Sequence, residues 1–79
     1  MTEGGYVRLI WDFRGPDSRG TAEHHAIHLN QFAQSNGIAM TDHGSQAINE
    51  MHHMAFMIVQ RKDMLTVRDA LRPHRATEV

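Results

Sequence analysis

The sequence lacks several features that would point to common functions. It has no cysteine, which excludes disulfides, thiolate metal ligands and cysteine nucleophiles. It has no excess of one charge, because eight Lys and Arg residues are scattered among nine Asp and Glu residues. Nucleic-acid-binding proteins carry a basic patch, so we expect no nucleic acid partner. No apolar run approaches the roughly 18 residues of a membrane span, and no leader pattern is present. We therefore expect a cytoplasmic protein with no membrane partner.

The length predicts one small domain over residues 1–79, with an ordered core over about 6–73. A chain this short has a small hydrophobic core, and it has no disulfides to strengthen it. Such proteins often gain stability from a partner subunit or from a bound ligand. The size alone thus favours an oligomer or a ligand-binding protein.

Hydrophobic periodicity predicts two strands, over residues 6–13 and 51–60, and two helices. The first strand has one apolar face and one mixed face, and the second is apolar on both faces, which is typical of a buried central strand. The first helix runs from about Thr21, with Ser18 or Thr21 as N-cap and Asn36-Gly37 at its C-terminus. The last helix begins near Asp63 and stops at Pro73. Residues 38–51 fit either a strand or, from Ser45, a helix, and the β-branched and aromatic residues that follow favour the strand.

The element order is therefore β-α-β-β-α, with at most a short final strand after Pro73. This order predicts an α+β, ferredoxin-like sandwich: an antiparallel sheet with both helices on one face. The other face would expose Tyr6, Ile10 and one side of the third strand as an apolar patch. A two-fold homodimer is the commonest way to bury such a patch, so we expect a homodimer.

Three segments, "YVRLIWDFRG", "AEHHAIHL" and "AFMIVQRKDMLTVRDALRP", resemble the dimeric α/β-barrel superfamily in their order and pattern. The resemblance covers most of residues 6–73. It implies two ferredoxin-like protomers with paired sheets and a small-molecule pocket between the sheet and the helices of each. Members include cofactor-independent monooxygenases, isomerases and haem-linked enzymes. This chain departs from the pattern in the short segment after Pro73, which leaves open the fourth strand and any dimer contact built from it.

Seven histidines are the compositional oddity of the chain. His24 and His28 are four residues apart, the spacing at which one helix face supplies two nitrogen ligands to a transition metal. A third ligand would have to come from His52, His53, Glu23 or Glu50. The glutamate of the zinc-protease helix motif is absent, which excludes that class. The sequence requires no cofactor, and a transition metal is the one that the histidines favour.

Histidine is also the natural acid–base group at the rim of an apolar pocket. The candidates are His25 on the inner stripe of the first helix and His52 or His53 on the central strand. Of the adjacent pair His52 and His53, one faces the helices and the other the opposite side of the sheet. The predicted pocket is lined by four aromatic side chains: Trp11, Phe13, Phe32 and Phe56.

Three hypotheses follow. The first is a small homodimeric protein that binds or converts a small, mostly apolar molecule between the sheet and the helices, with histidine as the polar or acid–base group. The second is a histidine-based transition-metal-binding protein. The third is a non-catalytic interaction module or a subunit of a larger complex. The sequence does not decide whether the protein is an enzyme.

Overall fold

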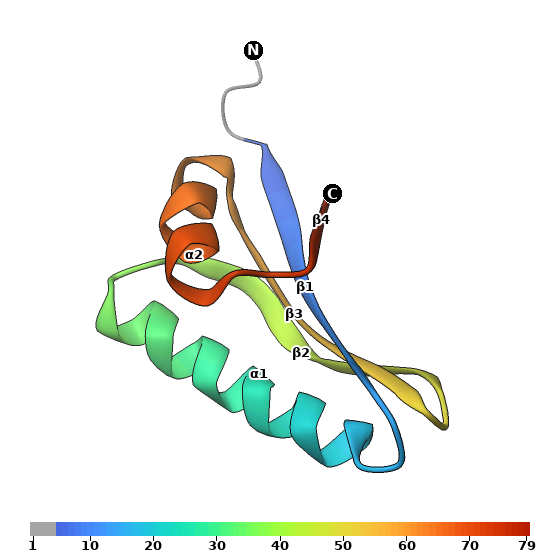
Figure 1. Ribbon diagram of the computed structural model, residues 1–79. Coiled ribbons are helices and arrows are strands. Elements are labelled where there is room, and N and C mark those ends of the chain that lie inside the picture. The colour runs from blue at the N-terminus through green and yellow to red at the C-terminus, as the bar shows by residue number, and fades with distance from the viewer. Residues whose placement is uncertain (1–4) are drawn as a thin grey trace.

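The computed structural model describes residues 5–79 and has one four-stranded sheet with two helices on one of its faces (Figure 1). The elements are β1 (Tyr6–Arg14), α1 (Ser18–Ser35), β2 (Met40–Asn49), β3 (His52–Gln60), the short 3-10 helix η1 (Arg61–Asp63), α2 (Met64–Leu71) and β4 (Arg75–Glu78). The strand order is β2-β3-β1-β4, and all neighbouring strands are antiparallel. The predicted ferredoxin-like α+β fold with a short last strand is confirmed. None of the helices within residues 5–79 is long and apolar enough to cross a membrane.

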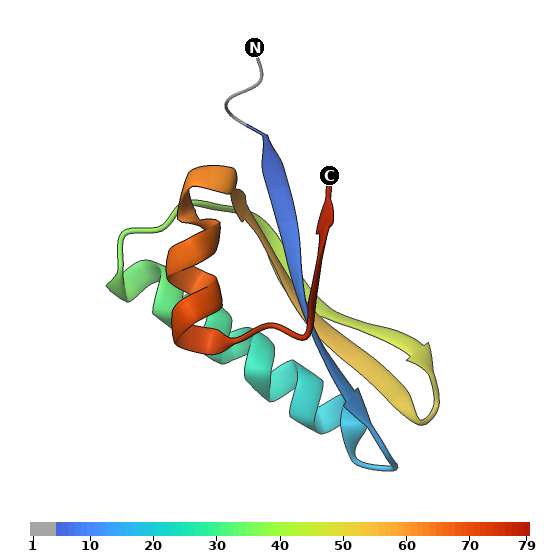
Figure 2. The same cartoon turned by 45° about the horizontal axis from the view of Figure 1, so that its top comes forward.

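Two points that the sequence left open are decided by strand pairing. Ser45 to Asn49 belong to β2 and pair with β3, so the helical alternative for this segment is wrong. Main-chain bonding to a well-formed central strand outweighs the weak 3.6-residue pattern of these residues. The last strand exists, because residues 75–78 pair with residues 7–10 of β1. It occupies the sheet edge beside the central strand β1 (Figure 2).

The hydrophobic core lies between the sheet and the helices. Alanines 22, 26 and 33 of α1 are buried against the sheet, and their small side chains let the helix approach it closely. Trp11 of β1 is 3% exposed, and its indole Nε1 donates a hydrogen bond of 2.9 Å to the carbonyl of Leu71, at the end of α2. This bond satisfies the polar atom of a large buried ring, and it ties α2 to the sheet.

The ends of α1 follow the sequence signals only in part. At the C-terminus, Gly37 has φ +66°, and Ile38 N–H donates to the Ala33 carbonyl at 2.9 Å, as in a Schellman motif. The predicted glycine stop is thus confirmed. At the N-terminus the helix begins at Ser18, and Asp17 holds the N-cap position without a side-chain cap bond. The prediction of Ser18 or Thr21 as N-cap is wrong, because the Ser18 hydroxyl is engaged with a side chain of β3 instead.

The helix-free face of the sheet differs from the expected apolar patch. Tyr6 is 41% exposed, but Ile10 is only 3% exposed and Ile58 only 7%. Arg75 pairs with Ile10 and Arg8 with Ile58 in the strand register, and the Arg8 guanidinium lies 5.4 Å from the centre of the Phe56 ring. Arginine side chains shield apolar surface with their aliphatic stems, and the Nε atom of Arg8 is itself buried. The prediction of an exposed patch that includes Ile10 is therefore wrong.

Replacement of Arg72 by glycine is expected to stabilise the protein by about 0.5 kcal/mol. Arg72 ends α2 in the left-handed conformation, at φ 52° and ψ 66°, which is costly for a residue with a Cβ atom. Glycine relieves that cost but also gains entropy in the unfolded chain, so the net gain is modest. Urea unfolding of Arg72→Gly and Arg72→Ala would test this. The alanine variant keeps the Cβ, so equal stability of the two variants would contradict the explanation.

Candidate functional site

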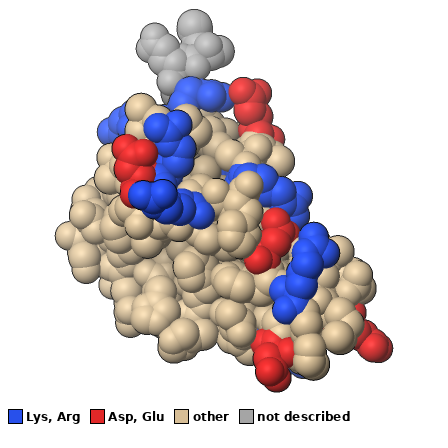
Figure 3. Space-filling view, in the orientation of Figure 1, with Lys and Arg blue, Asp and Glu red and all other residues tan. Residues whose placement is uncertain are grey.

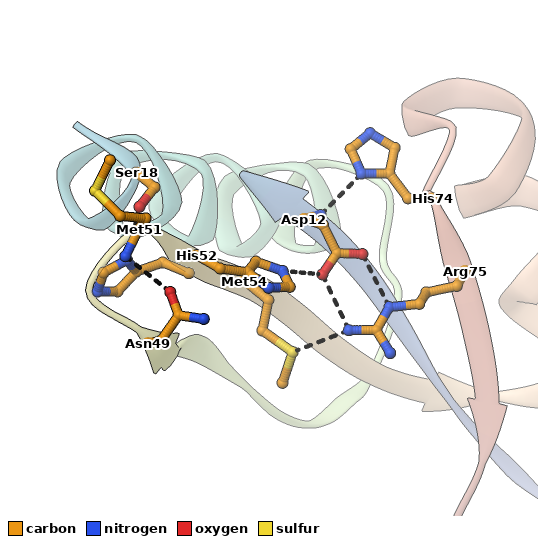
Figure 4. Close-up of polar contacts among 9 residues, drawn as sticks. Asp12, Ser18, Asn49, Met51, His52, Met54, His74 and Arg75 are labelled. Atoms are coloured by element: carbon orange, nitrogen blue, oxygen red, sulfur yellow. Dashed lines mark hydrogen bonds and ion pairs between the residues drawn. The ribbon is translucent and has the colours of Figure 1, made fainter. Parts of the chain in front are cut away.

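Asp12 is the centre of a polar cluster on the helix-free face, where β1, β3 and β4 meet (Figure 4). His52 Nε2 lies 2.8 Å from Asp12 Oδ1, and Arg75 donates from Nε to Oδ2 at 2.9 Å and from Nη2 to Oδ1 at 3.0 Å. The side chains of Asp12 and His52 are only 14% and 11% exposed. The hydrogen bond from Arg75 holds the pKa of Asp12 far below its ordinary value, against the opposing effect of burial. The cluster therefore links β4 to both central strands.

His53 lies on the opposite face of the sheet, as the alternation of a strand requires. Its Nδ1 atom lies 2.8 Å from the hydroxyl oxygen of Ser18, the first residue of α1. Ser18 is 2% exposed. This pair anchors the start of α1 on β3.

His25 lies on the sheet-facing side of α1, over the aromatic side chains of β1. Its ring centre is 5.1 Å from that of Trp11 and 5.4 Å from that of Phe13. Its Nε2 atom is buried and has no hydrogen-bond partner. Burial lowers the pKa of His25 from its ordinary value of 6.5, and the nearby histidines 28, 74 and 24 lower it further. Burial thus disfavours the charged form of His25, and its Nε2 atom has no hydrogen-bond partner among the aromatic rings.

His74 is a site residue that sequence reasoning missed. The main-chain N–H of Asp12 donates to His74 Nδ1 at 2.8 Å, and the ring lies 6.3 Å from that of Phe13. Because Nδ1 accepts this bond, it carries a lone pair, and the ring proton must be on Nε2. The only signal in the sequence is a histidine directly after the helix-ending Pro73. The pairing with β1, 62 residues away, is tertiary and leaves no local pattern.

The four aromatic residues of the predicted pocket do not lie together. Trp11, Phe13 and Phe32 are on the helix side of the sheet, where Trp11 belongs to the core and the other two pack against it. Phe56 lies on the helix-free face, opposite Gly44 and beside Arg8. Its inclusion among the pocket residues is corrected, because even-numbered positions of β3 point away from the helices.

His24 and His28 are exposed on the outer side of α1, and their Nε2 atoms are 2.9 Å apart. The structure thus brings together the two histidines that the spacing predicted as metal ligands. Neither strand histidine joins them, because His52 is bound to Asp12 and His53 to Ser18. Within residues 5–79, no three His, Cys, Asp or Glu side chains converge on a metal position. Of the four residues considered as a third ligand, His52 and His53 therefore do not join the pair.

A surface hollow of about 410 Å³ lies at the C-terminal end of α2, away from the predicted pocket. It is lined by Arg68, Asp69, Arg72 and Pro73. Asp69 lies 3.3 Å from Arg68, so part of the positive charge is neutralised within the hollow itself. The view in Figure 3 shows acidic and basic side chains interspersed, with no broad area of one sign on that side of the molecule.

Comparisons with protein-family models, with curated proteins and with solved structures find no match to this chain.

Proposed function

We propose that the protein binds a small, mostly apolar molecule on the helix side of its sheet, with His25 as the polar partner of that molecule. The single observation that carries this proposal is the buried Nε2 atom of His25, which has no partner although it lies among Trp11 and Phe13. An unpaired buried polar atom costs about 1–3 kcal/mol unless a bound water or ligand satisfies it. A ligand with a hydroxyl or carbonyl group would satisfy it.

His74 supports the proposal as a second polar group beside Phe13. A neutral imidazole at His25 can accept or donate one hydrogen bond, and His74 has a proton on Nε2 to donate. The two rings both contact Phe13, so a planar apolar molecule over that ring would meet a polar group from α1 and another from the segment before β4. The same pair is suited to moving a proton on the bound molecule, which makes acid–base conversion of the ligand the second part of the proposal.

The resemblance to the dimeric α/β-barrel superfamily agrees with this location, because that superfamily uses the space between sheet and helices. In this proposal the protein is a homodimer that associates through the helix-free faces of two sheets. The exposed Tyr6 ring is the apolar contribution to that contact, and the Arg8 and Arg75 side chains form its polar part. Sedimentation in solution measures the association directly.

The binding part is tested with phenol, indole and benzoate as probes. Trp11 is the only tryptophan of the chain, so its indole N–H gives one assignable NMR signal next to His25. At least one probe is expected to shift this signal. The substitution His25→Phe is expected to lower the affinity for that probe about tenfold, which corresponds to the loss of one hydrogen bond of about 1.4 kcal/mol.

The matched control is His43→Phe, the same substitution at an exposed position of β2. It is expected to leave the affinity of the probes unchanged. Either of two results would contradict the proposal: no shift of the Trp11 signal with any probe at millimolar concentration, or equal affinities for the wild type and His25→Phe.

A further inference from the structure

The outer face of α1 carries a second group of histidines that the proposed function does not use. His24 and His28 are both exposed, with ring centres 4.5 Å apart at an angle of 80° and Nε2 atoms 2.9 Å apart. They lie one helical turn from each other on a helix of 18 residues, so the backbone fixes their relative position. No core contact holds these rings, and the nitrogen atoms face each other.

The separation of the two nitrogen atoms is compatible with one class of coordination geometry. Imidazole nitrogens bind divalent metals at about 2.0–2.1 Å, so atoms 2.9 Å apart subtend an angle of about 90° at the metal. Neighbouring ligands of a tetrahedral ion subtend about 109° and would need to be roughly 3.3 Å apart. An angle near 90° is that of square-planar and tetragonal sites, which Cu(II) and Ni(II) prefer.

Metal binding by His24 and His28 requires neither a third protein ligand nor a change in the total number of protons on the two rings. In the neutral pair one Nε2–H donates a hydrogen bond to the other Nε2, whereas metal binding needs the lone pairs of both atoms. The proton moves to the exposed Nδ1 atom of the same ring, where water accepts it in a hydrogen bond, so the net protonation is unchanged. Glu23 is already paired with Arg19 at 3.2 Å. The remaining metal positions are thus filled by water or by an external ligand.

We propose that His24 and His28 form a two-nitrogen chelating site for Cu(II), and more weakly for Ni(II), with open coordination positions. The site shares no residue with the proposed ligand-binding site, because it lies on the outer face of α1 and His25 on the inner face. A metal bound there is nevertheless close to the core, because His24 and His28 are near enough to lower the pKa of His25, whose ring contacts Trp11.

The test is a titration of the full chain with copper sulfate, followed by quenching of Trp11 fluorescence and by electron paramagnetic resonance. The expected result is one Cu(II) per chain with a tetragonal spectrum and hyperfine coupling to two imidazole nitrogens. His24→Gln and His28→Gln are each expected to weaken binding at least tenfold and to remove the coupling to one nitrogen. Both substitutions are at exposed positions, and circular dichroism would confirm that the variants fold.

The control is His43→Gln, which removes an exposed histidine of β2 and is expected to bind copper as the wild type does. Copper bound with equal affinity by the wild type and by both α1 variants would overturn the proposal, since the ligands would then lie elsewhere. A wild-type spectrum without two equivalent nitrogens, or tighter binding of Zn(II) than of Cu(II), would overturn it as well.

Discussion

The substitution Asp12→Asn is expected to lower the free energy of unfolding by about 2 kcal/mol. The carboxylate accepts two hydrogen bonds from Arg75 and lies 2.8 Å from the buried ring of His52. Asparagine keeps the shape but removes the charge and one acceptor. Arg75 is 48% exposed and regains water, which limits the loss, whereas the buried ring of His52 loses its charged partner. In a domain of this size the loss corresponds to a decrease in Tm of roughly 8–16 °C.

Urea unfolding of Asp12→Asn and of Asp69→Asn would measure this effect. Asp69 pairs with Arg68 on the surface, where both side chains are more than half exposed. Removal of such a pair costs less than about 1 kcal/mol, so the second variant is a matched control for the loss of an aspartate charge. Similar stabilities of the two variants would show that the Asp12 cluster does not hold β4 in place.

The same cluster predicts how stability depends on pH in acid. The pKa of Asp12 in the folded protein is lower than its ordinary value of 3.8, so the unfolded chain takes up a proton first. The contribution of Asp12 is therefore fully present above pH 3.8 and is lost as the pH falls below that value toward the lower pKa of the folded state. Because Asp12→Asn cannot titrate, the difference in stability between it and the wild type is expected to shrink below pH 3.8.

The substitution His25→Phe is expected to raise the free energy of unfolding by about 1 kcal/mol at pH 7. Phenylalanine keeps an aromatic ring against Trp11 and Phe13 and removes the buried nitrogen that has no partner. A substitution that stabilises the protein while it weakens probe binding is typical of a residue kept for function. A loss of stability would show that the nitrogen already has a stabilising partner in the protein itself.

The increase in the free energy of unfolding that His25→Phe produces is expected to become larger as the pH falls. Burial first, and the neighbouring histidines second, lower the pKa of His25 in the folded protein below 6.5. The stability that the neutral ring provides is thus fully present above pH 6.5 and is lost as the pH falls through the lower pKa of the folded state. Phenylalanine does not titrate. Urea unfolding of the wild type and of His25→Phe at pH 7 and pH 5, with a metal chelator present, would measure this increase. The same difference in unfolding free energy at both pH values would contradict the lowered pKa of His25.

Local pattern was enough to predict the two central strands and the two helices, but not the two outer strands. Alternation over residues 6–13 and 51–60 placed both central strands to within a residue, because a half-buried or buried strand needs apolar side chains at fixed positions. The divergence of His52 and His53 followed from the same periodicity, since neighbouring residues of a strand point to opposite faces. The glycine that ends α1 was readable because few other residues adopt a positive φ.

The partners of each polar side chain were decided only by the tertiary structure. Asp12 lies near the end of a strand with no local pattern around it, and it binds residues 40 and 63 positions away. Ser18 was expected to cap a helix and contacts β3, and His74 was not considered because it follows a helix stop. Hydrogen bonds and ion pairs between distant segments depend on strand register and on how the elements pack. A local pattern of apolar residues therefore determined where the chain forms strands and helices, and only the folded sheet determined which of its histidines are free to bind.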